Sequence, residues 1–506
     1  MRLPRSVRLT ALAAALVAVP AGVSAAPAGA VTGPEASGTA YAATARLDIG
    51  AGTRACSGVL VDAEWLLTAK SCFVDNPAAG IDVPAGAPAL KTTATIGRTD
   101  LTTTAGQVRD VVRLVPDPDQ DLVLAKLASP VTGVTPVALS SSAPAAGEEL
   151  RVAGYGRTKD EWAPLKLHTG AFTVDSVTTS QVSINGKDGA AVCAGDAGGP
   201  LLRDVNGTLQ LVGVNSRSWQ GGCFGADPAE SRNGAVATRV DNGLRDWINL
   251  TMGPVCNSQG ALYSLVSDGS LLRRNIDDPK DGTGTIPAAT TIDTGWKGYG
   301  RVLAGPSATF YGIKSDGMYL SHRITSTATW DVHHKKISSS FTAYNTAANH
   351  NKISIDRSSR IWYVDDAGAL HWSRYVSASG TWEGGQAVDT GWGGYSHIFA
   401  ADDGVVYGID SATGHLVRSR YDFDAQRWVQ HQVTVDTNDW RATKQITSFG
   451  GDTVVRIKTD GDVRQYRYNE GTGTFDSWNK LLGSGDNWTL YTSVTASPEG
   501  CHLRIG

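Results

Sequence analysis

The sequence predicts an all-β protein in two parts, a double β-barrel followed by a five-bladed β-propeller. In the first half, short apolar runs separated by turn residues occur at 122–127, 150–153, 170–174 and 209–214, a pattern typical of barrels. In the second half a unit of 48 residues recurs five times, and ten of the fourteen tryptophans follow residue 252. Repeats of this length, each holding about four short strands, are typical of propellers.

Residues 1–30 have the composition of a secretory signal peptide. Three arginines precede an alanine-rich apolar core over residues 9–23, and small residues follow, which is the order found in secretory signals. The spacing of the small residues permits cleavage after Ala25 or after Ala30. No second apolar stretch of about 20 residues follows, so we expect a secreted, extracellular protein that does not enter a membrane.

Three segments of the first half form a set of motifs. Residues 193–202 read Cys-Ala-Gly-Asp-Ala-Gly-Gly-Pro-Leu-Leu, residues 65–72 read Trp-Leu-Leu-Thr-Ala-Lys-Ser-Cys, and residues 121–127 read Asp-Leu-Val-Leu-Ala-Lys-Leu. They resemble the nucleophile loop, the histidine loop and the aspartate strand of trypsin-like serine proteases of the S1 family. The resemblance covers residues 31–252 and implies a chymotrypsin-like double β-barrel that ends in a helix over residues 240–249.

The resemblance places the catalytic triad at Ser71, Asp121 and Ala197. Serine therefore stands where the family has its general-base histidine, and alanine stands where it has the nucleophilic serine. A serine hydroxyl attacks only after an imidazole takes its proton, and the aspartate serves to orient that imidazole. Because losing the serine or the histidine alone costs on the order of 10⁶ in turnover, the sequence predicts a pseudoprotease.

No nearby residue is expected to replace the missing base. His168 is the only histidine before residue 252, and the resemblance puts it on the first strand of the second barrel, away from the cleft. Lys70 precedes Ser71, but neighbours in a strand point to opposite faces. We therefore expect Lys70 and Ser71 not to form a catalytic pair.

Backbone functions of the cleft should survive these substitutions. An oxyanion hole uses backbone N–H groups, which any side chain other than proline leaves intact, and the resemblance places them at Gly195 and Ala197. It also implies that a mature chain beginning at Val31 pairs its α-amino group with the buried carboxylate of Asp196. Binding of a peptide or a protease inhibitor could thus outlast cleavage.

The primary specificity pocket of the cleft lacks a carboxylate at its base. The resemblance places Ala191 at the base, with Ser216 and Ser218 on the wall strand and an alanine near residue 235. A docked peptide should therefore present a small or apolar side chain rather than an arginine.

The six cysteines predict three disulfides in an exported chain. The resemblance implies that Cys56 pairs with Cys72 and Cys193 with Cys223. Cys256 and Cys501 then remain for each other, and their bond would join the two ends of the propeller. In the chain-entropy model so long a loop is worth on the order of 5 kcal/mol.

The 48-residue unit has an aromatic residue at a fixed place, at Trp296, Tyr344, Trp392, Trp440 and Trp488. Residues 262–271 and 310–319 show the unit clearly, with Leu-Tyr-Ser-Leu or Phe-Tyr-Gly-Ile before a Ser-Asp-Gly turn. With Gly-Trp-Gly-Gly-Tyr at 391–395, these repeats resemble the five-bladed tachylectin-2 type of propeller over residues 256–506. The resemblance implies binding of N-acetylated sugars. The five aromatic residues are candidates for sugar stacking, and inter-blade packing is the alternative.

Composition excludes several partners. The net charge is −4 over 506 residues without a basic block, so we expect no nucleic acid. We expect no cofactor, and no metal site because the cysteines are assigned to disulfides; His333 and His334 are expected in a solvated loop. Each half is long enough for its own core, so a monomer is expected.

The sequence therefore predicts a signal peptide at 1–30, a protease-like domain at 31–252 and a lectin-like propeller at 253–506. The favoured function is a secreted, inactive protease homologue that binds carbohydrate. An active extracellular serine endopeptidase targeted to glycans is the first alternative, which the missing hydroxyl at residue 197 opposes. A structural or protein-interaction module without a ligand is the second, and glycan binding would separate it from the favoured function.

Overall fold

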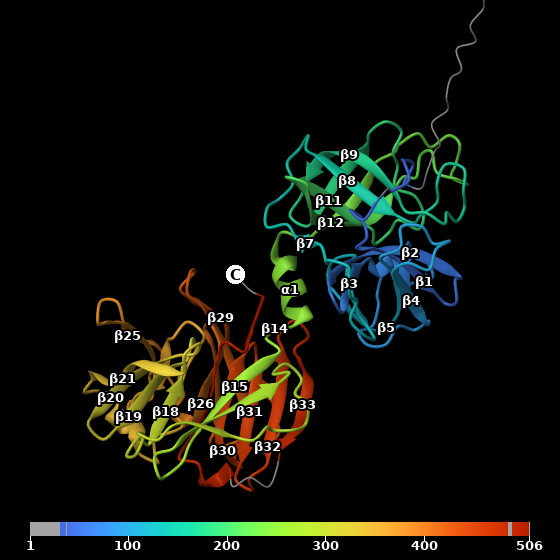
Figure 1. Cartoon of the computed structure of the whole chain (residues 1–506). Coiled ribbons are helices and arrows are strands. Elements are labelled where there is room, and N and C mark those ends of the chain that lie inside the picture. Colours follow the sequence, from blue (N-terminus) through green and yellow to red (C-terminus); the bar gives the residue numbers. More distant parts are fainter. Residues whose placement is uncertain (1–30, 37, 484–487, 505–506) are drawn as a thin grey trace, which may run out of the picture.

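The computed structural model describes residues 31–36, 38–483 and 488–504. The expected signal peptide lies outside the described residues. Two β-barrels are followed by a β-propeller, and α1 (Gly243–Met252) runs between them (Figure 1). The prediction of an all-β chain with this architecture is confirmed. The helices among the described residues are all too short or too polar to cross a bilayer.

The first barrel is a closed, antiparallel sheet of six strands in the order β1-β2-β3-β6-β5-β4. Its core is built from small and aliphatic side chains such as Leu47, Leu60 and Val123, which are fully buried. The helical turn η1 (Lys70–Phe73) follows the third strand. The strands are β1 (Thr44–Ile49), β2 (Arg54–Asp62), β3 (Trp65–Thr68), β4 (Thr92–Ile96), β5 (Gln107–Pro116) and β6 (Val123–Leu127).

The second barrel also has six strands, in the order β11-β8-β9-β10-β13-β12, and pairing of β11 with β12 closes it. A short strand, β7 (Ala138–Leu139), adds to β12 in parallel. The strands are β8 (Glu149–Gly154), β9 (His168–Val177), β10 (Gln181–Gly186), β11 (Pro200–Val205), β12 (Thr208–Ser218) and β13 (Ala235–Arg239).

A third apolar cluster joins the barrels to the helix. Leu67 of the first barrel, Leu202 of the second and Ile248 of α1 lie in it, all fully buried. The helix starts at Gly243 rather than at 240, because the Asn242 side chain accepts a hydrogen bond from the N–H of Leu244 and so caps it. Packing at this seam fixes the cleft between the barrels.

The propeller consists of five antiparallel four-stranded sheets, numbered here as blades 1 to 5 in chain order. Blade 2 is β18 (Arg301–Ala304), β19 (Thr309–Lys314), β20 (Gly317–Ile324) and β21 (Thr329–Ser338); blade 3 is β22 (Ile353–Ile355), β23 (Ile361–Val364), β24 (Leu370–Val376) and β25 (Thr381–Asp389); blade 4 is β26 (Tyr395–Asp402), β27 (Val405–Asp410), β28 (Leu416–Asp422) and β29 (Arg427–Asp436); blade 5 is β30 (Thr443–Gly450), β31 (Thr453–Lys458), β32 (Val463–Asn469) and β33 (Thr474–Gly483).

Blade 1 is assembled from both ends of the propeller. Its strands β15 (Gln259–Leu265), β16 (Leu271–Asp277) and β17 (Thr290–Asp293) are joined by β34 (Ser493–Ala496), which pairs with β15. Strands β14 (Val255–Cys256) and β35 (Cys501–His502) form a further pair, and the Cys256–Cys501 disulfide links them. The ring is therefore closed by strand pairing as well as by the disulfide expected from the sequence.

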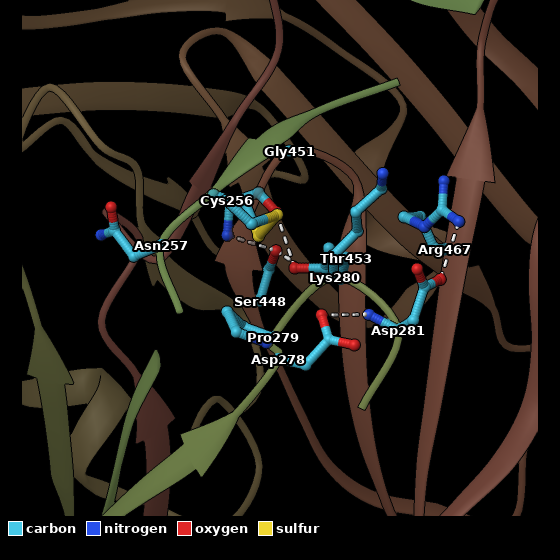
Figure 2. Close-up of a disulfide and its surroundings, with 12 residues drawn as sticks. Cys256, Asn257, Asp278, Pro279, Lys280, Asp281, Ser448, Gly451, Thr453 and Arg467 are labelled. Carbon is cyan, nitrogen blue, oxygen red and sulfur yellow. Dashed lines mark hydrogen bonds and ion pairs between the residues drawn. A yellow bond between two sulfur atoms is a disulfide. The ribbon is translucent and has the colours of Figure 1, made fainter. Parts of the chain in front are cut away.

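Blades 1 and 5 are also linked by side chains close to this disulfide (Figure 2). Cys256 lies near Ser448 and Gly451 of blade 5, and the Nη2 atom of Arg467 is 2.8 Å from the Oδ1 atom of Asp281. A disulfide and an ion pair thus act at the same junction, where the two ends of the propeller meet.

Contacts between the two domains surround the C-terminal end of α1. The Nη1 atom of Arg113 lies 3.1 Å from the Oδ1 atom of Asp476, and the Nζ atom of Lys280 lies 3.5 Å from the Oε2 atom of Glu64. Leu250 of the helix packs in a core cluster of the propeller. The barrels and the propeller are therefore in direct contact through polar and apolar groups.

Candidate functional site

Asp121 lies two residues before β6 in the cleft between the barrels, and both oxygens of its carboxylate accept hydrogen bonds. Its Oδ1 atom accepts a hydrogen bond from the N–H of Ser71 at 2.8 Å. Its Oδ2 atom accepts bonds from the hydroxyls of Ser71 at 3.0 Å and of Ser216 at 2.7 Å. The carboxylate that would orient an imidazole in a protease is here satisfied by two serine hydroxyls and one backbone donor.

Lys70 and Ser71 do not converge, as expected. The Nζ atom of Lys70 donates to the carbonyl of Asp117 at 2.8 Å and is buried away from Ser71. The expected reason was wrong, because both residues lie in η1 rather than in a strand. His168 begins β9, where its Nδ1 atom lies 3.2 Å from the carbonyl of Gly33, and burial lowers its pKa.

Ala197 lies in the loop before β11, and its methyl group packs against the core of the first barrel. It lines the same cavity as Ser71 and Ser216, of about 240 Å³. The structure therefore brings together the three positions that the sequence assigns to the triad, with Asp121 held by Ser71 and with Ala197 beside Ser71 in the cavity wall.

The backbone around Ala197 leaves two donors open to the cleft. Among the described residues, the N–H groups of Gly195 and Ala197 donate to no other group. Gly195 has φ of +102°, and a Cβ atom there would lie 2.7 Å from the Cα atom of Gly156, so a side chain would not fit. The hydroxyl of Ser57 fixes this peptide by donating to the carbonyl of Gly195 at 3.0 Å.

Asp196 is completely buried behind this loop. Its carboxylate accepts hydrogen bonds from the N–H groups of Gly156 at 2.8 Å and Cys193 at 2.9 Å, and from the backbone nitrogen of Val31. Burial raises the pKa of Asp196 to about 7, although these three hydrogen bonds oppose the shift. Val31 is itself fully buried in the core of the second barrel, so the two residues expected to pair are in contact.

The predicted pocket residues divide into two groups. Ser216 and Ser218 line the cavity of about 240 Å³. Ala191 is buried behind its wall, packed beside the Cys193–Cys223 disulfide. A neighbouring cavity of about 380 Å³ is lined by Ser71, Asp121, Ser216 and Arg217 among others. Because the two cavities share Ser71, Ser216 and Arg217, the cleft is open on both sides of Ser71.

The three expected cysteine pairs are disulfides in the structure. Cys56 is joined to Cys72 beside η1, Cys193 to Cys223 beside the pocket, and Cys256 to Cys501 at the ring closure. Each bond thus holds a functional loop or the ends of the propeller.

The five aromatic residues of the repeat are all buried, with exposed fractions between 0% and 6%. Three of the indoles donate their Nε1–H to an aspartate that ends the preceding outer strand. The donor–acceptor distances are 2.8 Å for Trp296 and Asp293, 2.7 Å for Trp392 and Asp389, and 2.6 Å for Trp440 and Asp436. The hydroxyl of Tyr344 donates to the carbonyl of Val364. The Cζ atom of the Arg274 guanidinium lies 4.6 Å from the ring centre of Trp488. These rings anchor polar groups at the blade junctions.

At each of two junctions, a similar cluster of polar and aromatic side chains reaches the surface. The first junction cluster, between blades 1 and 2, consists of Asp293, Tyr299, Trp330, His333 and His334. The second junction cluster, between blades 3 and 4, consists of Asp389, Tyr395, Trp428, His431 and Gln432.

The chemistry of the two junction clusters is alike. The Nε2 atoms of His333 and His431 each lie 2.7 Å from the Oδ2 atom of the junction aspartate. Although partial burial opposes it, hydrogen bonds from the histidine and the indole hold the pKa of Asp293 and of Asp389 below the usual value. His333 and His334 lie in β21, so the expectation of a solvated loop was wrong.

Comparison with known proteins agrees with this geometry. Residues 30–248 match the family model described as trypsin, and residues 264–493 match the model described as tachylectin. The chain joins a trypsin-family serine protease domain to a tachylectin domain. The disulfide-bonded, trypsin-like fold is consistent with an extracellular protein.

Individual relatives match the trypsin-family domain. Trypsin-1 of Salmo salar is 29% identical over 229 residues, which are 42% of this chain and 87% of the relative. Trypsin of Sus scrofa is 27% identical over 231 residues, 41% of this chain and 89% of the relative. Transmembrane protease serine 9 of Rattus norvegicus is 32% identical over 193 residues, 33% of this chain and 17% of the relative.

Sequence reasoning missed the junction aspartates of the tachylectin domain. Asp293 and Asp389 each precede the repeat tryptophan by three residues, in the motif Asp-Thr-Gly-Trp, and Asp436 precedes Trp440 by four. This recurrence was visible in the sequence and was the signal for the junction clusters. The hydroxyl of Ser216 on Asp121 was also missed, because it comes from a distant strand.

Proposed function

We propose that this chain is a secreted pseudoprotease that binds carbohydrate through its tachylectin domain. The observation that carries the first part is the state of the triad positions. Ala197 has no nucleophilic atom, and Ser71 and Ser216 occupy Asp121. Without an imidazole no group can take a proton from an attacking oxygen and return it to the leaving amine.

Ser71 itself is unsuited to act as a nucleophile. Its hydroxyl donates to the Oδ2 atom of Asp121, and Lys70, the nearest amine in sequence, bonds to the carbonyl of Asp117 instead. The same carboxylate also accepts hydrogen bonds from the N–H of Ser71 and the hydroxyl of Ser216, so it holds the Ser71 side chain in place. Ser71 thus keeps the loop in place by satisfying Asp121.

The cleft keeps the features that bind a peptide. The free N–H groups of Gly195 and Ala197 can receive a carbonyl oxygen, and the cavity beside them is lined by small side chains such as Ser216 and Ser218. We propose that this cleft retains a peptide segment or a protease inhibitor, with a small or apolar side chain in the pocket.

In the tachylectin domain we propose that carbohydrate, with N-acetylated sugars as the leading class, binds at the blade junctions. Sugar hydroxyls need convergent donors and acceptors beside an apolar surface. The junction clusters supply carboxylate, imidazole and partly exposed indole groups, and the buried Trp296 and Trp392 each donate a hydrogen bond to the junction aspartate from below.

We further propose that residues 1–30 are a signal peptide, that the mature chain begins at Val31, and that the domains meet between residues 252 and 253. Burial of Val31 beside Asp196 supports this start, because an α-ammonium group there would neutralise the buried carboxylate.

Two assays of the secreted protein test this function. On a glycan array we expect binding to sugars, weakened by Asp389→Asn, which replaces the carboxylate shared by Trp392 and His431 with a neutral amide. With a panel of fluorogenic peptides we expect no hydrolysis above a blank. Absence of any glycan binding by folded protein would reject the lectin half, and hydrolysis would reject the pseudoprotease half.

A further inference from the structure

The first junction cluster contains three metal-ligating side chains that the proposed function does not need together. The Nε2 atom of His333 lies 2.7 Å from the Oδ2 atom of Asp293, and the Nε2 atom of His334 lies 4.0 Å from the same oxygen. One ligand atom from each of the three residues lies within 4.8 Å of the other two. Imidazole and carboxylate groups in this combination are typical of zinc sites.

The two histidines face the same side because the strand is irregular there. Neighbouring side chains in a regular strand point to opposite faces. His334 has φ of +53°, and the register of β21 against β20 shifts at this point. The two imidazole rings consequently lie side by side, with 4.0 Å between their centres.

Other residues of the cluster already orient the ligands. Trp296 donates to the Oδ2 atom of Asp293 at 2.8 Å, and the hydroxyl of Tyr299 lies 2.8 Å from the Nδ1 atom of His334. A ligating histidine usually bonds through its other ring nitrogen in this way. When Nδ1 carries the proton and donates to Tyr299, the Nε2 lone pair is free for a metal.

The Nε2 atom of His334 is buried and has no hydrogen-bond partner within the described part of the chain. A Cβ atom on Gly295 would lie 3.0 Å from it. Gly295 itself is exposed, so this side of the cluster borders solvent.

The second junction cluster shows how the same position is filled without a metal. There Gln432 replaces His334, and its Nε2 amide donates to the Oδ2 atom of Asp389 at 3.2 Å. The amide of Gln432 thus adds a third hydrogen bond to this carboxylate oxygen, beside those from Trp392 and His431. In the first junction cluster the equivalent imidazole nitrogen stays 4.0 Å away and bonds to nothing described.

We propose that Asp293, His333 and His334 bind one Zn²⁺ ion, with a water molecule beside Gly295 as the fourth ligand. Tetrahedral zinc with ligand bonds of about 2.0–2.2 Å places ligand atoms about 3.3 Å apart. The separation of His333 from Asp293 must therefore increase, and that of His334 from Asp293 decrease, each by less than about 1 Å. The proposal goes beyond sugar binding and does not rest on it.

Isothermal titration of tag-free, full-length mature protein with ZnCl₂, after dialysis against EDTA, tests the site. We expect one ion per chain, and His334→Gln, which installs the residue of the second junction cluster, should weaken binding at least about tenfold. His322→Gln is the matched control, because His322 forms an ordinary surface pair with Asp331, and it should bind Zn²⁺ like the wild type.

The reverse exchange tests the same geometry by a gain. Gln432→His gives the second junction cluster the full ligand set, so the variant should bind two ions per chain. Calorimetric melting of the metal-free proteins verifies that each variant is folded. Equal Zn²⁺ affinity of the wild type and His334→Gln, or no binding by folded wild type, would overturn the proposal.

Discussion

The two domains differ in whether their candidate functional groups belong to the backbone or to the side chains. In the trypsin-family domain the backbone N–H groups of Gly195 and Ala197 face the cleft, while serine and alanine stand at positions 71 and 197 beside Asp121. In the tachylectin domain the backbone repeats from blade to blade, and the side chains at the junctions differ, as with His334 and Gln432. The candidate groups of the cleft thus belong mainly to the backbone, whereas those of the blade junctions are side chains that vary within a repeated backbone.

The largest effect is expected from the disulfide that joins the two ends of the propeller. Replacing Cys256 and Cys501 together by serine should destabilise the tachylectin domain by about 3–5 kcal/mol, because the disulfide closes a loop of 245 residues. The pairing of β34 with β15 should still let the ring form. Differential scanning calorimetry should show one transition moving down, and equal movement of both transitions would mean that the domains do not unfold separately.

The next comparison is between a buried and a partly exposed tryptophan of the propeller. Trp392 is fully buried, whereas 43% of the Trp478 surface is exposed. Trp392→Ala should reduce the free energy of unfolding by about 3–5 kcal/mol. Trp478→Ala should cost about 1 kcal/mol or less. Urea denaturation measures the free energy of unfolding of both variants. Losses of similar size would show that the tryptophan of the repeat contributes no more to stability than an exposed tryptophan does.

Much of the fold could be predicted because its signals are local. The segments around residues 71, 121 and 197 and the 48-residue unit specified the barrels and the blades. The membership of β34 in blade 1 could not be predicted, because that pairing joins strands from opposite ends of the propeller. His333 and His334 were misplaced because a bulge, which no sequence pattern marks here, turns both rings to one side.

For the candidate site, the sequence names positions but does not give the interactions between them. Ser71 and Ala197 followed from the motifs, whereas the bond from Ser216 to Asp121 depends on the approach of β12 to β6 across the cleft. The packing of Ala191, the proposed base of the pocket, against the Cys193–Cys223 disulfide likewise could not be read from the sequence.

A pH effect at Asp196 tests whether Val31 begins the mature chain. When Val31 carries an amide bond, Asp196 has a raised pKa of about 7 in the folded state. The folded state then binds the proton more tightly than the unfolded state, so stability falls by a few kcal/mol as the pH rises from about 4 to about 7. When Val31 carries a free ammonium group, its positive charge favours the ionised carboxylate, so the decline in stability between about pH 4 and about pH 7 should shrink or disappear.

Unfolding in urea at several pH values, for chains beginning at Val31 and one extended before it, distinguishes the two cases. Asp196→Asn should abolish the decline in the extended chain. The same decline in both chains would show that the Val31 nitrogen does not act on Asp196.

The smallest effect is expected where the domains touch. Arg113 is partly exposed and pairs with Asp476, which Arg467 also contacts at 3.0 Å. Arg113→Ala should therefore cost less than about 1 kcal/mol and leave glycan binding unchanged. Calorimetry at low and high salt measures this, and a loss of several kcal/mol would make the interface a major source of stability.

The central claim is that the cleft is inactive only because two side chains are missing. The most direct test compares peptide hydrolysis by the wild type, by Ser71→His, by Ala197→Ser and by the double variant. The cavity of about 380 Å³ beside Ser71 and Asp121 offers room for the imidazole. We predict that only the double variant cleaves, and cleavage by the wild type or by Ala197→Ser alone would contradict this account.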